Sequence, residues 1–371
     1  MPPVNAEDTM RYWRALDGLR GVAILAVMLF HAHVPLVRGG FLGVDIFFVL
    51  SGFLITTQLL REVSRTGSVR FGRFFLRRAV RLQPALMLML AIYFLGSLLG
   101  LIPGTARVVT TDITIVLLAL THWARAFNWL SPDYLGHAWS LGIEEQFYVL
   151  WALVFGALGQ SAARRWRVVT LAALGALIGM AWMGLLTKQG ASLVRLYNGL
   201  DTRAMALLCG CALAGWFHTI RPTRLEALLP AAVDPQVEPG NSWATVSGVV
   251  ALAGLLWAIL NFEWTHPYMF PWGYMGVALL ALVLIASIVQ APDNRLSKLL
   301  GMSAIVSIGR ISYGLYLWHY PLYRVAEAQG KATGYSLGIT MTAATLMTFI
   351  TAWLSYRWVE HPFRAWFFRR P

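Results

Sequence analysis

Stretches of about twenty mainly apolar residues recur along the whole chain and determine its class. A helix that crosses the hydrocarbon core of a bilayer needs about 20 such residues. Only 13% of the 371 residues are charged and 58% are hydrophobic, a balance far from that of soluble domains. We predict an all-α polytopic membrane domain over residues 11–364, with cytoplasmic tails at 1–10 and 365–371 and no appended soluble domain. The ten predicted spans are residues 16–36, 41–60, 84–102, 138–158, 168–187, 199–217, 243–260, 272–290, 303–322 and 335–354.

The basic residues give this domain a predicted orientation. The chain carries 30 Lys+Arg against 17 Asp+Glu, and these charges lie in short stretches between the apolar segments. With both termini in the cytoplasm, Lys and Arg favour the inner loops by about three to one, as the positive-inside rule requires. An eleventh span at 112–128 would spoil this bias, so that short stretch is expected to be re-entrant or interfacial. The net charge of +13 therefore indicates a bilayer rather than nucleic acid as partner. The Pro-rich loop 218–242 is expected to be flexible.

The first span carries two ionisable residues that share one helix face. Arg20 and His31 are eleven residues apart, which returns to nearly the same face with a rise of about 16 Å. Such groups are costly in lipid and tend to line cavities or sites. The alternative is that Arg20 is a positive-inside anchor and His31 an interfacial residue. His33 lies off this stripe, nearer the outer surface.

The second span adds Asp45, Ser51 and Gly52. Asp45 suits either the orientation of a histidine or a helix start, where a carboxylate complements the dipole. Ser51 lies outside any G-x-S-x-G nucleophile elbow, so close helix packing at Ser51-Gly52 is the preferred interpretation. Cys209 and Cys211, at spacing i, i+2, point to different sides of a helix and predict neither a disulfide nor a metal pair.

A basic amphipathic helix follows the second span. Its arginines repeat at i, i+3, i+7 and i+11 along one stripe. One interpretation is an anchor on anionic lipid headgroups. The other is a clamp for the phosphates of a cytoplasmic cofactor, since guanidinium forks suit phosphate. The stripe consists of Arg70, Arg73, Arg77 and Arg81.

Two further spans carry polar residues. Glu144 and Glu145 enter the apolar stretch 138–158, and their side chains diverge by about 100°, so they are not expected to meet at one point. Favourable acids at a helix start are the alternative. The stretch 303–322 carries Arg310, Tyr313, Tyr316 and His319, where an aromatic belt at the outer interface is the alternative. The candidates for lining a substrate cavity are Trp139, Arg310, Tyr316 and His319.

Together these segments resemble the integral-membrane acyltransferase family 3, which includes bacterial O-acetyltransferases of O-antigen and exopolysaccharide. The resemblance rests on DGLRG-x9-H, GVDIFFVLSGFLI, RRAVRLQPA, HAWSLGIEEQFYVLW, ISYGLYLWHYP and YRWVEHPFR, in family order from about residue 11 to 364. It implies about ten core helices in the bacterial inner membrane. It also implies transfer of an acyl group, by family habit acetyl, from cytoplasmic acyl-CoA to a hydroxyl of a carbohydrate or lipid-linked glycan. No metal is implied.

The resemblance also assigns roles to residues. The Arg/Lys-x10-His motif falls on Arg20 and His31, the Arg-x-x-Arg motif on Arg78 and Arg81, and the glutamate motif on Glu144 and Glu145. His31 would act as general base or transient acyl carrier. A carboxylate, Asp45 or Glu144, would fix its tautomer. Phosphates would be held by Arg78 and Arg81, with Arg77 and Arg20 nearby.

Two other functions suit part of the pattern. A transporter or flippase also needs buried charges in ten helices, although no inverted repeat is evident. Glycerolipid acylation usually shows His-x4-Asp, and none of the eight histidines has an aspartate five residues on. Acceptor recognition is expected to involve outer segments near 103–137, 188–198 and 261–271.

Overall fold

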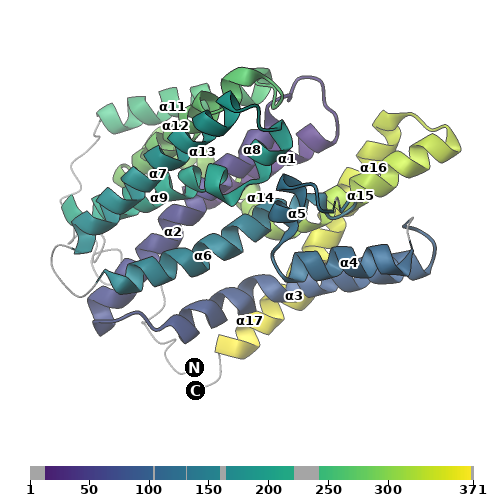
Figure 1. Cartoon of the computed structure of the whole chain (residues 1–371), viewed down its shortest axis with the longest axis horizontal. Helices are drawn as coiled ribbons and strands as arrows, with labels where there is room; N and C mark the ends of the chain where they lie inside the picture. The colour runs from purple at the N-terminus through teal and green to yellow at the C-terminus, as the bar shows by residue number, and fades with distance from the viewer. Residues whose placement is uncertain (1–12, 103–104, 131, 159–163, 221–241, 369–371) are drawn as a thin grey trace.

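The helices form one bundle, shown in a computed structural model (Figure 1). The structure describes residues 13–102, 105–130, 132–158, 164–220 and 242–368. These residues form helices and connecting turns, and no strand occurs among them. The long helices are α1 (Arg14–His31), α2 (Gly43–Thr66), α3 (Phe71–Leu98), α6 (Trp139–Ala157), α7 (Arg164–Lys188), α9 (Leu200–Ile220), α11 (Ser242–Asn261), α12 (Trp272–Gln290), α15 (Ser312–Thr333) and α16 (Leu337–Ser355). The shorter elements are η1 (Gly40–Leu42), α4 (Ala106–Leu117), α5 (Thr121–Ala126), η2 (Gly136–Ala138), α8 (Leu193–Asn198), η3 (Pro267–Met269), α13 (Arg295–Leu300), α14 (Ser303–Arg310), η4 (Tyr356–Glu360) and α17 (His361–Phe368).

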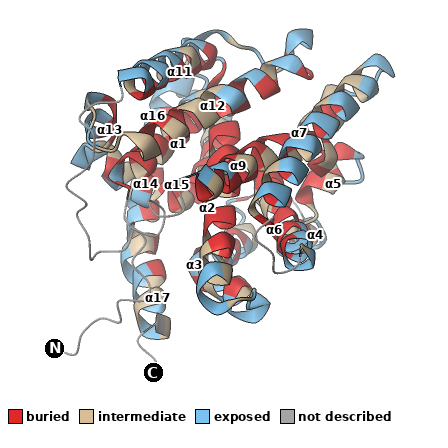
Figure 2. Ribbon diagram, turned by 90° about the vertical axis from the view of Figure 1, so that its left-hand side faces the viewer, coloured by how far each residue is buried: buried red, intermediate tan, exposed pale blue. Residues whose placement is uncertain are grey.

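Helices α2 and α9 form the centre of the bundle. Most of the apolar window of each is buried inside the protein, whereas α3, α7, α11 and α16 leave two thirds or more of theirs uncovered, as Figure 2 shows by colour. Glycines allow the central pair to approach closely. A Cβ on Gly52 would lie 1.9 Å from the Leu207 carbonyl oxygen, and one on Gly210 would lie 2.0 Å from that of Val49. Small residues at crossing points are typical of helix pairs in membranes, and the predicted packing role of Gly52 is confirmed.

Seven helical segments are long and apolar enough to cross a membrane, judged by length and composition over the described residues. They correspond to seven of the ten predicted spans. The other three predicted spans contain α1, α6 and α15, in which charged and polar residues interrupt the apolar sequence. A helix of that composition is stable in a bilayer only when its polar face is covered by neighbouring helices or water. Each of the three helices carries a polar residue that its neighbours cover at least in part: Arg20 on α1, Glu144 on α6 and His319 on α15.

The structure changes the predicted boundaries in three places. The basic helix after the second span is not separate, because α3 runs unbroken through it and through Pro84 to Leu98. The stretch 303–322 is two helices, α14 and α15, divided at Ile311. The stretch 112–128 is also two short helices, α4 and α5, separated by Ala119 in the left-handed conformation (φ 54°). Neither α4 nor α5 approaches the length of about 20 residues that a span requires.

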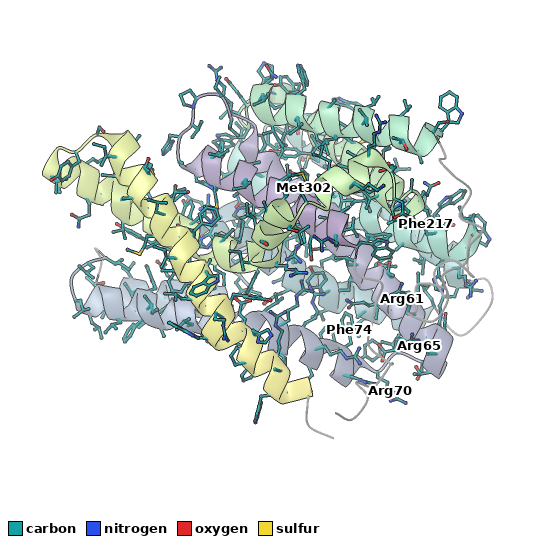
Figure 3. All side chains as sticks on the ribbon, turned by 180° about the vertical axis from the view of Figure 1, so that it is seen from behind. Arg61, Arg65, Arg70, Phe74, Phe217 and Met302 are labelled. Carbon is teal, nitrogen blue, oxygen red and sulfur yellow. The ribbon has the colours of Figure 1, made fainter. Side chains whose placement is uncertain are left out.

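Two predicted features lie wholly or partly outside the described residues. They are the tail 1–10 and the Pro-rich loop, of which 221–241 falls outside. Part of the predicted tail 365–371 is helical, since α17 continues to Phe368. The described basic residues at the junction of α2 and α3 gather at one end of the bundle, where Figure 3 labels Arg61, Arg65 and Arg70.

Candidate active site

His31 and His319 face each other between α1 and α15. The Nδ1 atom of His31 lies 3.2 Å from Nε2 of His319 and 3.1 Å from the carbonyl oxygen of Val27. The Nδ1 atom of His319 lies 2.7 Å and 3.1 Å from the carbonyl oxygens of Tyr316 and Leu315. Since carbonyl oxygens only accept, His319 carries its proton on Nδ1 and presents an unprotonated Nε2.

This arrangement fixes the tautomer of His31. Its Nδ1–H donates toward the Val27 carbonyl and His319 Nε2, which leaves the Nε2 lone pair free. His31 is half-buried, whereas His319 is fully buried. The free nitrogen of His31 thus belongs to the more accessible of the two rings, as a general base or nucleophile requires.

A third histidine and two tyrosines complete this part of the site. His137 precedes α6, and its ring lies 5.6 Å from that of His319 and stacks on Tyr320 at 5.1 Å. The Tyr320 ring also packs edge-on against His31 at 5.2 Å. We call His31, His137 and His319 the histidine cluster. Among the described residues, no three His, Cys, Asp or Glu side chains are arranged to hold a metal ion.

Tyr316 anchors the histidine cluster to α6. Its hydroxyl donates to the carbonyl oxygen of His137 at 2.8 Å and lies 2.6 Å from Oγ of Ser140. All three residues are buried. The predicted cavity candidates Tyr316 and His319 therefore both belong to the histidine cluster region.

The glutamates of α6 lie further along the same helix and diverge as predicted. Glu144 accepts a 2.6 Å hydrogen bond from Oγ of Ser51 on α2. Glu145 accepts one from the Gln83 amide of α3 at 3.3 Å. Both carboxylates lie close enough to Arg78 for electrostatic attraction.

Four arginines from three segments meet beyond these glutamates, and we call them the arginine cluster: Arg20, Arg78, Arg81 and Arg364. The charge of Arg81 is repelled by those of the other three. Arg78 lies over the Tyr148 ring at 3.3 Å, and Arg20 lies 3.7 Å from Asp17. Among the described residues, neither Arg78 nor Arg81 has a carboxylate within 4 Å. Arg78 and Arg81, held near other arginines without a contacting carboxylate, therefore form a site suited to a polyanion.

The two clusters stand at opposite ends of one helix face. Helix α1 is unbroken from Arg20 to His31, so the rise of about 16 Å between them holds. On α15, the Tyr313 hydroxyl donates to the Leu82 carbonyl oxygen of α3 near the arginine cluster, and His319 lies nearly two turns further on. Several side chains along this line keep partial solvent exposure, among them Arg20, His31, Ser51, Arg78, Glu144, Tyr313 and Tyr320.

Asp45 differs from its predicted role. Its carboxylate accepts 2.8 Å and 2.9 Å hydrogen bonds from Arg203 of α9, and each side chain is 1% exposed. The guanidinium carbon of Arg203 lies 3.8 Å from the Tyr274 ring centre and 5.8 Å from that of Trp139. Neither Asp45 nor Glu144 contacts His31, because each carboxylate is bonded elsewhere. The orienting groups are instead His319 and the Val27 carbonyl.

The remaining predicted site residues belong to neither the histidine cluster nor the arginine cluster. Arg310 is exposed at the end of α14, separated from Tyr316 by the helix break. Trp139 packs on Tyr197 at 4.6 Å and on Phe48 at 6.0 Å. Arg77 is half-buried on α3. His33 is exposed and forms a 2.7 Å ion pair with Glu327, in line with its expected place at the surface.

Sequence reasoning missed His137, Tyr320 and Arg125. His137 and Tyr320 stood inside quoted motifs, HAWSL and LWHYP, but neither shares a helix with His31 and so has no periodic relation to it. Arg125 lies near the polar end of the short apolar stretch 112–128. The sequence feature that could have identified all three as site residues is the same: each is a polar residue inside or beside an apolar segment.

The chain belongs to the acyltransferase domain family, which matches residues 13–357. Its membership of this family and its several helices long and apolar enough to span a membrane agree with the resemblance seen in its motifs.

Three curated relatives of this chain are named as O-acetyltransferases or putative O-acetyltransferases. The chain is 34% identical over 367 residues to peptidoglycan O-acetyltransferase OatA of Listeria monocytogenes, covering 95% of this chain and 56% of that protein. It is 33% identical over 364 residues to a putative O-acetyltransferase of Staphylococcus aureus, covering 96% and 58%. It is 32% identical over 379 residues to putative peptidoglycan O-acetyltransferase YrhL of Bacillus subtilis, covering 97% and 56%. The chain thus spans slightly more than half the length of these relatives. No solved structure matches it.

Proposed function

We propose that the protein transfers an acetyl group from acetyl-CoA, bound at the arginine cluster, to a hydroxyl of a cell-surface carbohydrate that reaches the histidine cluster. The observation that carries this proposal is that the contacts of His31 Nδ1 leave its Nε2 free near one end of α1, while the arginine cluster lies near the other end. The names of the relatives support O-acetylation and favour peptidoglycan as the acceptor. We place the enzyme in the bacterial cytoplasmic membrane.

The proposed donor site matches the charge and the length of coenzyme A. Coenzyme A carries phosphates at one end and its thioester at the other, joined by a long flexible arm. Phosphates are bound well by planar guanidinium groups that have no carboxylate partner, and Arg78 and Arg81 meet that condition. The arm would then lie along the partly exposed side chains toward His31, about 16 Å from Arg20 along α1.

The reaction at His31 is ordinary general base catalysis. His31 Nε2 takes the proton of the acceptor hydroxyl as its oxygen attacks the thioester carbonyl carbon. The tetrahedral intermediate then collapses with cleavage of the C–S bond, and the proton passes from His31 to the departing thiolate. The products are an O-acetyl ester and free coenzyme A. His319 accepts the Nδ1–H of His31 and stabilises the imidazolium that forms during attack.

The acceptor would approach from the histidine end. There α5 and the turn after it carry three rings in a nearly parallel stack, Trp123 on Phe127 at 5.6 Å and Phe127 on Trp129 at 5.4 Å. Phe127 and Trp129 are exposed. Flat exposed aromatic surfaces suit the C–H faces of sugar rings. This segment lies in the predicted acceptor region 103–137.

The donor site gives a first prediction. Replacing Arg78 and Arg81 together by glutamine should raise the KM for acetyl-CoA by about 100-fold, because two charge-assisted phosphate contacts of about 1.5–3 kcal/mol each are weakened. The KM for the acceptor should stay near its normal value. Steady-state kinetics on purified protein in lipid nanodiscs measures both.

Arg73→Gln is the matched control for this experiment, because Arg73 is exposed on the same helix and belongs to neither cluster. Its kinetics should equal those of the wild type. An unchanged KM for acetyl-CoA in the double variant would contradict the assignment of the donor site.

The orienting role of His319 gives a second prediction. His319→Phe keeps the ring volume but removes the acceptor for His31 Nδ1–H, and should lower kcat by about 10–100-fold, as loss of an orienting partner does at other histidine sites. The kcat–pH profile should shift as well, because the protonated form of His31 loses a stabilising neighbour. A structural role alone would lower the amount of folded enzyme and leave the profile in place.

Product analysis tests the function as a whole. Purified protein is incubated with isotope-labelled acetyl-CoA and soluble peptidoglycan glycan strands, and the strands are examined by mass spectrometry for a mass increase of one acetyl group. Base-labile labelled ester on the glycan is the expected result. Movement of unmodified glycan across the bilayer without ester formation would instead indicate a transporter.

A further inference from the structure

Arg125 lies beside the histidine cluster without an acidic partner. It comes from α5, the short helix between α4 and α6, and it is half-buried. Within the described part of the chain, its guanidinium makes one hydrogen bond, from Nε–H to Oδ1 of Asn198 at 3.0 Å. Among the described residues it forms no salt bridge. A guanidinium held this way keeps four of its five N–H donors for another group.

The surroundings hold this guanidinium in a definite place. Asn198 is 1% exposed, and its amide Nδ2–H donates to the Val194 carbonyl at 2.8 Å, which turns Oδ1 toward Arg125. On the other side stands Gly136, where a Cβ would lie 2.5 Å from Nη1 of Arg125 and 3.4 Å from the Tyr320 hydroxyl. The absence of a side chain at Gly136 therefore makes the room that the guanidinium occupies.

Arg125 also acts electrostatically on the reacting groups. Its positive charge is felt by His31, His137 and Tyr320. Tyr320 connects the two sites physically, since its ring packs on His31 and its hydroxyl lies next to the Gly136 position that Arg125 covers. Tyr320 also feels the carboxylates of Asp133 and Glu327, but both pair with Arg324, so Arg125 has no carboxylate partner among the described residues.

We propose that Arg125 is a catalytic residue that stabilises the oxyanion formed when the acceptor hydroxyl attacks the thioester. This inference rests on the proposed function. In that step the carbonyl π electrons move onto oxygen as the new C–O bond forms, and His31 holds the acceptor's proton. When the C–S bond breaks, the electron pair of the oxyanion re-forms the C=O bond, and the negative charge leaves on the thiolate, which takes the proton from His31. A fixed cation at the oxygen lowers the barrier because it is already oriented before the charge develops.

A different ligand for Arg125 would be a carboxylate of the acceptor. Stabilisation of the oxyanion and binding of an acceptor carboxylate predict different changes in kcat and KM. A group that binds only in the transition state changes kcat, whereas one that binds the acceptor equally in ground and transition states changes its KM. The position next to Tyr320 favours the oxyanion, since the Tyr320 ring packs edge-on against the His31 ring, which carries the reacting nitrogen.

The test compares Arg125→Gln, Arg125→Lys and Gly136→Ala with Arg38→Gln as control. Arg125→Gln should lower kcat by about 100-fold or more, the usual effect of removing one oxyanion donor, with both KM values near normal. Arg125→Lys should retain part of the rate. Gly136→Ala should also lower kcat, because its methyl group displaces the flexible end of Arg125 while every charge remains. Arg38 is exposed and pairs with Glu263 at the surface, so its variant should behave as wild type.

Chemical rescue separates catalysis from folding. Ethylguanidinium added to Arg125→Ala should restore part of kcat, an effect that a purely structural arginine would not show. Full activity in Arg125→Gln, or a loss confined to the acceptor KM, would overturn the inference while leaving the proposed function intact. Absence of acetyl transfer in the wild type and in Arg38→Gln would instead count against the proposed function.

Discussion

Replacing His31 by alanine is expected to lower acetyl transfer by about 10³-fold, the middle of the range for loss of a general base. The free Nε2 of this imidazole is the group that removes the acceptor's proton, and the two partners of Nδ1 determine that it is free. Transfer of labelled acetyl to soluble glycan strands in nanodiscs measures the effect. Thermal unfolding of the same preparation should show that the variant remains folded.

His33→Ala is the matched control for this experiment. His33 lies two residues from His31 but is exposed, and its imidazole pairs with Glu327 rather than with the histidine cluster. Its removal should leave kcat within about twofold of the wild-type value, since surface ion pairs contribute at most about 1 kcal/mol. If His31→Ala and His33→Ala were equally active, His31 would have no part in the chemistry.

The second large effect is expected on stability, at the buried pair of Asp45 and Arg203. Asp45→Leu leaves a guanidinium that is 1% exposed without its counter-ion inside the bundle. Breaking such a pair from one side costs about 3–5 kcal/mol. We expect a lower Tm and little folded protein, as measured by the thermal unfolding of detergent-purified samples.

Removing both charges should be far less harmful than removing one. In Asp45→Leu with Arg203→Met no unpaired charge remains, and replacement of buried ion pairs by apolar residues is often neutral. Arg38→Leu serves as control, because its pair with Glu263 is exposed and contributes little. If Asp45→Leu kept the wild-type Tm but lost acetyl transfer, Asp45 would belong to the chemistry after all.

Local periodicity predicted much of the fold and part of the site. The apolar stretches gave the long helices, including 272–290, which coincides with α12. Helical geometry correctly separated Glu144 from Glu145, because a rotation of about 100° is a property of the helix itself. It also placed Arg20 and His31 at the two ends of one segment of α1.

Contacts between residues that are far apart in the sequence could not be predicted from local sequence patterns. His319 is 288 residues from His31, and Arg203 is 158 residues from Asp45. Asp45 near the start of a helix suits a dipole role and a histidine partner equally well, and only the packing of α2 against α9 shows that its partner is an arginine. The continuity of α3 through Pro84 was hidden for a different reason, since proline usually marks a helix boundary.

Sided reconstitution tests the central claim most directly. The protein is placed in vesicles, the orientation of each population is determined by labelling engineered cysteines at the two ends of the bundle, and labelled acetyl-CoA is supplied on one side only with glycan strands on the other. The account predicts O-acetylated glycan only when acetyl-CoA meets the end that bears the arginine cluster and glycan meets the end that bears the histidine cluster. Ester formation only when donor and acceptor share one compartment would contradict it.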